Sequence, residues 1–311
     1  MGPLVSVVIA NHNRWPMLRQ AIESVLAQTF NDFELIVVDD GSTDGSADLV
    51  EATFPDVRLL RQANAERGAA YNHGIRAAHG RYIAFLDNDD VYELQHLAGF
   101  ARARLASPDT RVFAVRASLW DPQTGRRRLL PRIDPDTLLW DALVRTVIPY
   151  QAMVVERSAL LEIGGLPEDR ELMGCDDWLL LLDLAHRFRV QLLPGSSVLI
   201  RIHPGRSMND FRAISRSREV ATRRILAGDL LHLELDDGCR TLLVAGTHQL
   251  TASHWYAAGE MRLARASMRE VRRTLGLGRG LRWTARLWCQ SWLGPVGVRL
   301  VGWVRDSLVW R

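Results

Sequence analysis

The stretch from residue 82 to residue 90 constrains the fold most, because an apolar run ends there in a group of carboxylates. The run Tyr82 to Leu86 is rich in aromatic and aliphatic residues and too short for a helix, so we predict a buried strand. The strand is followed directly by Asp87-Asn88-Asp89-Asp90. In a parallel α/β sheet, ligands bind outside the carboxyl ends of the strands. The acids could form a solvated turn that caps a helix, but their hard oxygens also suit Mg²⁺ or Mn²⁺.

A second predicted strand ends in acids in the same way. Residues 33–38 form an apolar run that leads into Asp39 and Asp40, and the earlier run 4–10 ends at Asn11. Helical patterns lie between these runs, and such alternation indicates βαβ units and a mostly parallel, Rossmann-like sheet flanked by helices. One acidic pair can accept hydrogen bonds from a nucleotide base or ribose, while the other holds a metal ion on its phosphates.

Several nucleotide-binding classes are disfavoured by the absence of their glycine motifs. No GxGxxG follows the first strand, so a dinucleotide-dependent dehydrogenase is disfavoured, and no GxxxxGK[ST] phosphate loop exists. A nucleotidyltransferase would need a glycine-rich, basic loop after the first strand, and Asn11-His12-Asn13-Arg14 is not such a loop.

Composition is that of an ordinary globular protein, and 311 residues suggest about two domains. Three widely spaced cysteines support neither a disulfide framework nor a zinc site, and they fit a reducing compartment. No signal peptide or membrane-spanning run is predicted, so we expect a cytoplasmic protein.

Several ordered segments together resemble the family 2 glycosyltransferases of GT-A fold. They are VSVVIANHNR, DFELIVVDDGSTDGS, NAERGAAYNHGI, GRYIAFLDNDD, VVERSALLEIGGLPED and GCDDWLLLLDLA. The resemblance covers roughly residues 3–205 and implies a catalytic domain over residues 1–210. It further implies inverting transfer of a sugar from a nucleoside-diphosphate sugar, UDP being favoured, to a carbohydrate or lipid-linked acceptor in polysaccharide or glycoconjugate biosynthesis.

The resemblance also implies roles for residues that bind the nucleotide. Ala10 and Asn11 would lie against the base by their backbone, and Asp40 would accept a hydrogen bond from the base imide, with Asp39 beside it. Arg67 would approach the base or the diphosphate.

The same resemblance implies a metal site. Asp87 would lie near the ribose and the metal, and Asp89 would bind Mg²⁺ or Mn²⁺ on the two phosphates. His203 follows a predicted strand and could complete the metal or diphosphate site, although a lone histidine is more often structural. Tyr150 and Gln151 are candidates to face the donor sugar.

Asp177 resembles the general base that deprotonates the acceptor hydroxyl. Asp176 is the alternative base, and both could cap the helix that follows them. Many relatives carry an acid at the position of Leu179 and an arginine at that of Asp183, so the acceptor side of this helix differs from the usual one. This departure leaves open a second hypothesis, a non-catalytic sugar-nucleotide-binding or assembly module.

The region 211–311 is predicted to be helical, with long segments at 213–235, 239–258 and 261–275. Its last thirty residues hold half of the tryptophans, interleaved with arginines: Trp283, Trp288, Trp292, Trp303, Trp310, Arg282, Arg286, Arg299 and Arg305. Such a mixture is typical of helices at a membrane surface. The alternatives are a helical cap and a dimer contact, and nothing in the first two hundred residues points to nucleic acid. We therefore expect contact with the inner face of the cell membrane through these C-terminal helices, while the sequence predicts no particular oligomeric state.

Overall fold

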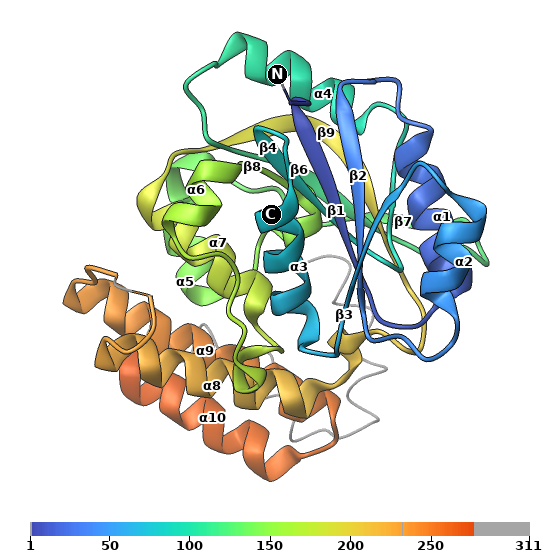
Figure 1. The fold of residues 1–311 in the computed structure, drawn as a ribbon. Helices are drawn as coiled ribbons and strands as arrows, with labels where there is room; N and C mark the ends of the chain where they lie inside the picture. Colours follow the sequence, from blue (N-terminus) through green and yellow to red (C-terminus); the bar gives the residue numbers. More distant parts are fainter. Residues whose placement is uncertain (1, 232, 277–311) are drawn as a thin grey trace. The chain divides into compact units, whose positions relative to one another are not determined.

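The computed structural model describes residues 2–231 and 233–276, which form two compact units. Among these residues, the first unit comprises 2–138 and 146–204, and the second comprises 139–145, 205–231 and 233–276. Figure 1 shows the elements coloured along the sequence.

The first unit alternates strands with helices. Its strands are β1 (Val5–Asn11), β2 (Phe33–Asp40), β3 (Arg58–Gln62), β4 (Tyr82–Asp87), β5 (Val91–Tyr92), β6 (Val112–Trp120), β7 (Arg127–Leu129), β8 (Met153–Glu156) and β9 (Val190–Arg201). Its helices are α1 (Trp15–Leu26), α2 (Ser46–Thr53), α3 (Glu66–Ala77), α4 (His96–Ala106), α6 (Arg157–Glu162) and α7 (Asp176–Arg187). Short 3₁₀ turns lie at η1 (Pro135–Thr137), η2 (Tyr150–Ala152) and η3 (Arg170–Leu172).

The strands form one mixed sheet in the order β3-β2-β1-β4-β8-β6-β9-β5, with β7 paired to β6. The first four strands in this order are parallel, β8 runs antiparallel to both its neighbours, and β6 and β9 are parallel. The predicted α/β fold with a mostly parallel sheet flanked by helices is therefore confirmed.

The strand order explains where the acidic residues meet. The chain steps outward from β1 to β2 and β3 and then returns through α3 to β4, on the other side of β1. Because such crossovers are right-handed, α3 covers the face opposite α1 and α2, as Figure 1 shows. Adjacent strands β1 and β4 thus form a topological switch point, and the crevice at their carboxyl ends is the usual ligand site.

Close packing of α3 on the sheet fixes this arrangement. A Cβ built on Gly74 would lie 2.3 Å from a methyl carbon of Val8, so only glycine allows α3 to approach β1 this closely. The core strands β1 and β4 are almost fully buried along their length.

The second unit is helical, as predicted. It contains α5 (Leu138–Val144), η4 (Ser207–Asn209), α8 (Phe211–Ala227), α9 (Asp237–Ala257) and α10 (Met261–Leu275). Buried Arg218 of α8 donates from Nε to Oγ1 of Thr247 in α9 at 3.3 Å and from Nη2 to the carbonyl of Leu143 in α5 at 3.2 Å. Apolar side chains of α9 and α10 also pack together, including Ala252, Ala264 and Met268.

One helix of this unit is shorter than the sequence pattern predicts. The pattern at 213–235 predicted a continuous helix, but α8 ends at Ala227 because Gly228 adopts a left-handed conformation with φ of 81°. The tryptophan- and arginine-rich stretch at 282–311 lies outside the described residues. No helix among the described residues is long and apolar enough to cross a membrane.

Candidate active site

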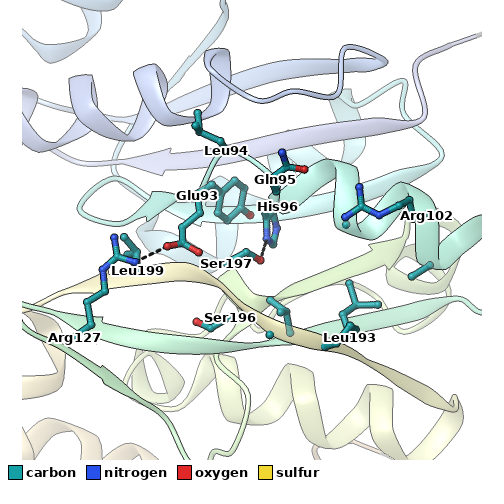
Figure 2. Close-up of a pocket in the computed structure, with 16 residues that line it drawn as sticks. Glu93, Leu94, Gln95, His96, Arg102, Arg127, Leu193, Ser196, Ser197 and Leu199 are labelled. Carbon is teal, nitrogen blue, oxygen red and sulfur yellow. Dashed lines mark hydrogen bonds and ion pairs between the residues drawn. The ribbon is translucent and has the colours of Figure 1, made fainter.

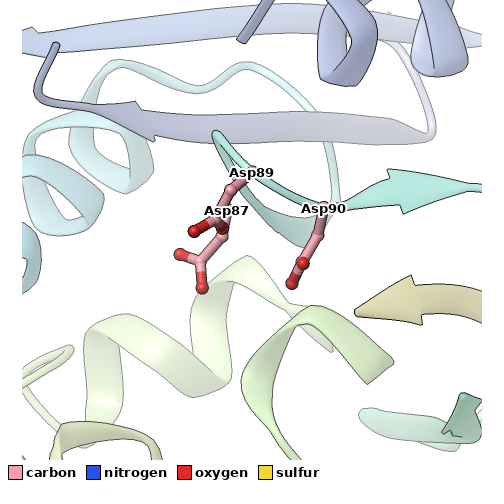
Figure 3. A group of neighbouring side chains, drawn as sticks. All are labelled: Asp87, Asp89 and Asp90. Atoms are coloured by element: carbon pink, nitrogen blue, oxygen red, sulfur yellow. The ribbon is translucent and has the colours of Figure 1, made fainter. Parts of the chain in front are cut away.

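Three carboxylates lie together where β4 ends. Asp87 is the last residue of β4, and Asp89 and Asp90 follow in the turn that leads into β5. One oxygen of each side chain lies within 4.8 Å of those of the other two, and Figure 3 shows their grouping. Since β4 borders the switch point, these oxygens lie in the part of the sheet where α/β proteins bind ligands.

Uncharged donors hold two of these carboxylates in place. Oδ1 of Asp87 accepts from the hydroxyls of Tyr71 and Tyr150, at 3.0 and 2.7 Å. The amide Nε2 of Gln151 donates to Oδ2 of Asp87 at 2.9 Å and to Oδ2 of Asp90 at 2.8 Å. These bonds fix the orientation of the two side chains without cancelling their charge.

Burial makes the ionised forms of these acids costly. It raises the pKa of Asp87, although the nearby Arg67 acts in the opposite direction. The pKa of Asp90 lies well above its ordinary range, because the group is buried and because Asp89 and Asp87 are negatively charged neighbours. Carboxylates crowded in this way are stabilised when a cation is close to them.

Asp89 contacts basic side chains from two distant segments. Its Oδ2 accepts from Nη1 of Arg14 at 2.7 Å and lies 2.9 Å from Nε2 of His203. Its backbone carbonyl accepts from Nε of Arg201 at 2.8 Å. Arg14 takes part from an unusual backbone conformation, since it and Asn13 both have positive φ, at 68° and 60°. Such conformations cluster at functional sites.

The three acids retain the capacity to bind a divalent cation. Within the described part of the chain, Oδ1 of Asp89 has no hydrogen-bond partner. Oδ2 of Asp87 and Oδ2 of Asp90 each accept from one amide, which leaves a lone pair on each oxygen. Carboxylate oxygens are the ligands preferred by Mg²⁺ and Mn²⁺, so the residues present fit such an ion.

At the end of β2, both carboxylate oxygens of Asp39 accept hydrogen bonds from the protein. Its Oδ2 accepts from Nδ2 of Asn11 at 2.9 Å, and its Oδ1 accepts from the backbone N–H of Ser42 at 3.0 Å. The side-chain oxygen of Asn11 in turn accepts from Nδ2 of Asn88 at 2.8 Å. Side chains therefore join the ends of β2 and β1 to the acidic turn after β4.

Asp40 differs from Asp39 in keeping an open oxygen. Its Oδ1 accepts from Nε2 of Gln62 and from the backbone N–H of Ala65, both at 2.8 Å. Among the described residues no hydrogen bond reaches its Oδ2. Ala10 of β1 lies between the two acidic edges, since it pairs with Val38 on one side and with Asp87 on the other.

Arg67 forms an ion pair with Asp176 at the start of α7. Its Nη2 and Nε donate to the two oxygens of Asp176 at 2.6 and 3.0 Å. Its guanidinium carbon also lies 5.3 Å from the ring centroid of Tyr150, whose hydroxyl donates to Asp87. The start of α7 is thereby connected to the cluster after β4.

The ion pair distinguishes Asp176 from its neighbour Asp177. Asp176 is buried and occupied by Arg67, whereas Asp177 is partly exposed and accepts from the N–H of Trp178 at 2.7 Å. Burial and then the charge of Asp176 raise the pKa of Asp177 to about 7, with Arg67 opposing them. A carboxyl group with a pKa in this range is suited to take up a proton near neutral pH.

The unusual residues of α7 have structural roles. Leu179 is fully buried, and Asp183 is buried with Oδ1 2.5 Å from Nε of Arg187 one turn later. The buried Leu179 and the Asp183–Arg187 pair leave Asp177 partly exposed at the start of α7.

Sequence reasoning assigned no role to three residues that contact the acids after β4: Arg14, Tyr71 and Arg201. Two of them carry a signal that could have been used. Tyr71 lies one helical turn after Arg67 and therefore on the same face of α3, and Arg14 lies in the polar segment between β1 and α1. Arg201 carries no such signal, because its approach to Asp89 depends on the pairing of β9 with β5.

The fold and these groups define an α/β protein with an acidic centre at its switch point. Residues 6–163, just over half of the 311-residue chain, match the family model described as glycosyl transferase family 2. The chain belongs to this family of glycosyltransferases.

Curated relatives match over part of their length. An uncharacterized glycosyltransferase of Nostoc, alr2836, is 47% identical over 93 residues, which are 29% of this chain and 29% of the relative. The uncharacterized glycosyltransferase EpsJ of Bacillus subtilis is 34% identical over 134 residues, 42% of this chain and 38% of the relative. The matched segments thus span well under half of either relative.

Solved structures share the fold over most of the chain. The S. aureus TarS 1–349 structure, a complex with UDP-GlcNAc, has a TM-score of 0.58 at 17% identity, covering 88% of this chain and 83% of that one. The mannosyltransferase PcManGT of Pyrobaculum calidifontis, in complex with GDP-Man and Mn²⁺, has a TM-score of 0.57 at 18% identity, covering 97% and 81%. This likeness confirms the predicted GT-A type of fold.

Proposed function

We propose that this chain transfers a sugar from a nucleoside-diphosphate sugar to a hydroxyl group of an acceptor, with inversion at the anomeric carbon. The observation that supports this best is the linkage of two acidic groups through Asp176, Arg67, Tyr150 and Asp87. Through it the partly exposed Asp177 belongs to the same constellation as the acids after β4. Residues 1–210 form the proposed catalytic domain.

In this proposal Asp40 recognises the nucleotide base. Its open Oδ2 can accept a hydrogen bond from an N–H group, and uracil and guanine both carry one on the ring. Two structural neighbours were solved with different donors, UDP-GlcNAc and GDP-Man. We favour a UDP-sugar, with Ala10 and Asn11 against the base.

Asp87, Asp89 and Asp90 would hold Mg²⁺ or Mn²⁺ in the proposal, with His203 beside Asp89. When bound, the cation would supply positive charge for the departing diphosphate. The hydroxyls of Tyr71 and Tyr150 and the amide of Gln151 keep the carboxylates oriented, so little reorganisation is needed at the moment of reaction. Arg67 keeps Asp176 in an ion pair and leaves Asp177 as the accessible carboxylate.

Asp177 would remove the proton of the acceptor hydroxyl. The hydroxyl oxygen then forms the new bond to the anomeric carbon as the bond to the diphosphate oxygen breaks. Attack from the face opposite the leaving group inverts the anomeric configuration. The proton ends on the carboxylate of Asp177, and the products are the glycoside and the nucleoside diphosphate.

Release of nucleoside diphosphate tests this proposal. The full chain is incubated with UDP- and GDP-sugars and candidate carbohydrate acceptors, with and without Mn²⁺, and thermal shift is recorded for the same ligands. We expect metal-dependent stabilisation by one nucleotide and acceptor-dependent release. Stabilisation without release by any donor would instead support the non-catalytic binding module.

Contact with the inner face of a membrane through the tryptophan-rich tail is a separate proposal, because these residues lie outside the described ones. Co-sedimentation of the full chain with anionic vesicles tests it, in comparison with a variant in which Trp283, Trp288 and Trp292 are replaced by alanine. Equal partitioning of the two proteins would contradict membrane contact.

A further inference from the structure

The first unit also contains a cavity of about 840 Å³ that none of the site carboxylates lines. It lies between the β5–α4 segment and the paired strands β6 and β9, and Figure 2 shows the side chains around it. Ligand pockets in proteins commonly have volumes of about 300–1,000 Å³. The cavity is therefore large enough for a small molecule, at a place that the proposed sugar transfer does not use.

A buried histidine of this cavity has an unsatisfied nitrogen. His96 is only 3% exposed, its ring stacks on Tyr92 with centroids 3.9 Å apart, and its Nδ1 lies 2.8 Å from Oγ of Ser197. Its Nε2 is buried without a hydrogen-bond partner among the described residues. Burial lowers the pKa of His96 to about 3, so the ring is neutral and Nε2 can form one hydrogen bond. Leaving such an atom unpaired costs about 1–3 kcal/mol, a cost typical of functional sites rather than of ordinary core packing.

The charged side chains of the cavity leave one cation available. Nη1 of Arg127 lies 2.5 Å from a carboxylate oxygen of Glu93, as the dashed line in Figure 2 marks. Arg102 of α4 is exposed and has no ion pair or hydrogen bond with any described residue. One of its guanidinium nitrogens lies 4.0 Å from the position that a Cβ on Gly99 would occupy, and both residues line the cavity. A free guanidinium is suited to bind a carboxylate or a phosphate through two parallel hydrogen bonds.

The remaining lining combines hydroxyls with apolar surface. Ser196 and Ser197 of β9 present hydroxyls, while Leu193, Pro194 and Val115 supply apolar walls. Sugars have the same combination, with hydroxyls around the ring edge and C–H groups on its faces.

We propose that this cavity is a second ligand site that binds a saccharide carrying a carboxylate or a phosphate group. The anionic group pairs with Arg102, and the ring packs against Leu193 and Pro194 beside the serine hydroxyls. The ligand is either an acidic unit of a glycan or a free sugar phosphate, which present the same anionic and hydroxyl groups. The inference does not depend on the proposed transfer reaction.

Ligand-observed saturation-transfer NMR on the full chain tests the site. The probes are glucuronate for the acidic glycan unit, glucose 1-phosphate for the sugar phosphate, and neutral glucose as the reference. Each is measured with and without excess UDP and Mn²⁺, which bind the proposed donor site. We expect at least one acidic probe to bind about tenfold or more tightly than glucose, because a charged hydrogen bond is lost in the neutral sugar. Its binding should persist when UDP is present.

Two variants locate this binding. Arg102→Ala should remove the preference for the acidic probe, and Gly99→Leu should block the part of the cavity next to Arg102 and abolish binding while favouring the helix. Arg19→Ala, an exposed arginine on α1, is the matched control and should bind as the wild type does. Binding unchanged in both cavity variants, displacement of the probe by UDP, or failure of both acidic probes to bind would each overturn the proposal.

Discussion

The acids at the end of β2 and those at the edge formed by β4 and α7 follow similar sequence patterns but have different surroundings. At β2, Asp39 uses both oxygens in bonds to the protein, and Asp40 uses one. At the β4–α7 edge, burial and neighbouring charges raise the pKa of Asp87, Asp90 and Asp177. The first region uses carboxylates mainly to shape a turn, while the second concentrates negative charge that a cation can offset.

The difference shows that donors around a carboxylate decide its role more than its place in a motif does. A backbone N–H and an asparagine amide satisfy Asp39. Asp87 and Asp90 also accept hydrogen bonds on both oxygens, but they share one glutamine amide, and each Oδ2 keeps a lone pair beside the oxygens of the other acids.

The largest effect is expected at the β4–α7 edge. Asp177→Asn should lower the rate of nucleoside diphosphate release by about 10²–10⁴, because it removes a general base. Nucleotide binding should be unchanged in a calorimetric titration. The exposed Asp56→Asn is the control, and an Asp177→Asn protein with wild-type rate would show that another group is the base.

Low pH should reduce the rate of nucleoside diphosphate release. The pKa of Asp177 is about 7, and the base works only when ionised, so kcat/KM should fall about tenfold for each pH unit below 7. Rates measured between pH 5 and 9 give this profile. A rate that stays level down to pH 5 would contradict the raised pKa.

A smaller effect is expected from Asp40 at β2. Asp40→Asn should weaken nucleotide binding about five- to tenfold, since a charge-assisted hydrogen bond to the base becomes a neutral one. Stimulation of binding by Mn²⁺ should persist, because this residue is separate from the acids after β4. If Mn²⁺ no longer strengthened nucleotide binding in this variant, Asp40 and the acids after β4 would not act separately.

Replacement of Asp39 should lower the stability of the fold more than it weakens nucleotide binding. In Asp39→Asn the new amide would oppose the amide of Asn11, so we expect a loss of about 1–3 kcal/mol in the free energy of unfolding. Urea unfolding compared with Asp56→Asn measures it. An unchanged midpoint would show that the Asn11 network does not stabilise the turn.

The fold was predictable because its signals are local. Apolar runs such as Tyr82 to Leu86 mark strands, and the alternation with helices predicts a parallel sheet whose strand ends carry Asp40 and Asp87 to one edge. The end of α8 was missed because a left-handed glycine, Gly228, interrupts a helical pattern that continues beyond it.

The contacts within the site were less predictable because they join residues far apart in sequence. The ion pair of Arg67 with Asp176 spans 109 positions, and the contact of Arg14 with Asp89 spans 75. No periodic pattern encodes such pairs, which depend on how the helices and turns pack around the sheet.

Calorimetric titration of the full chain with Mn²⁺ and then UDP tests the central claim, that the acids after β4 bind a divalent cation that holds the nucleotide. The account predicts that the wild type and Asp40→Asn bind Mn²⁺, that Asp89→Ala does not, and that Mn²⁺ tightens UDP binding only where Asp89 is present. Mn²⁺ binding by Asp89→Ala equal to that of the wild type, with the same effect on UDP, would contradict it.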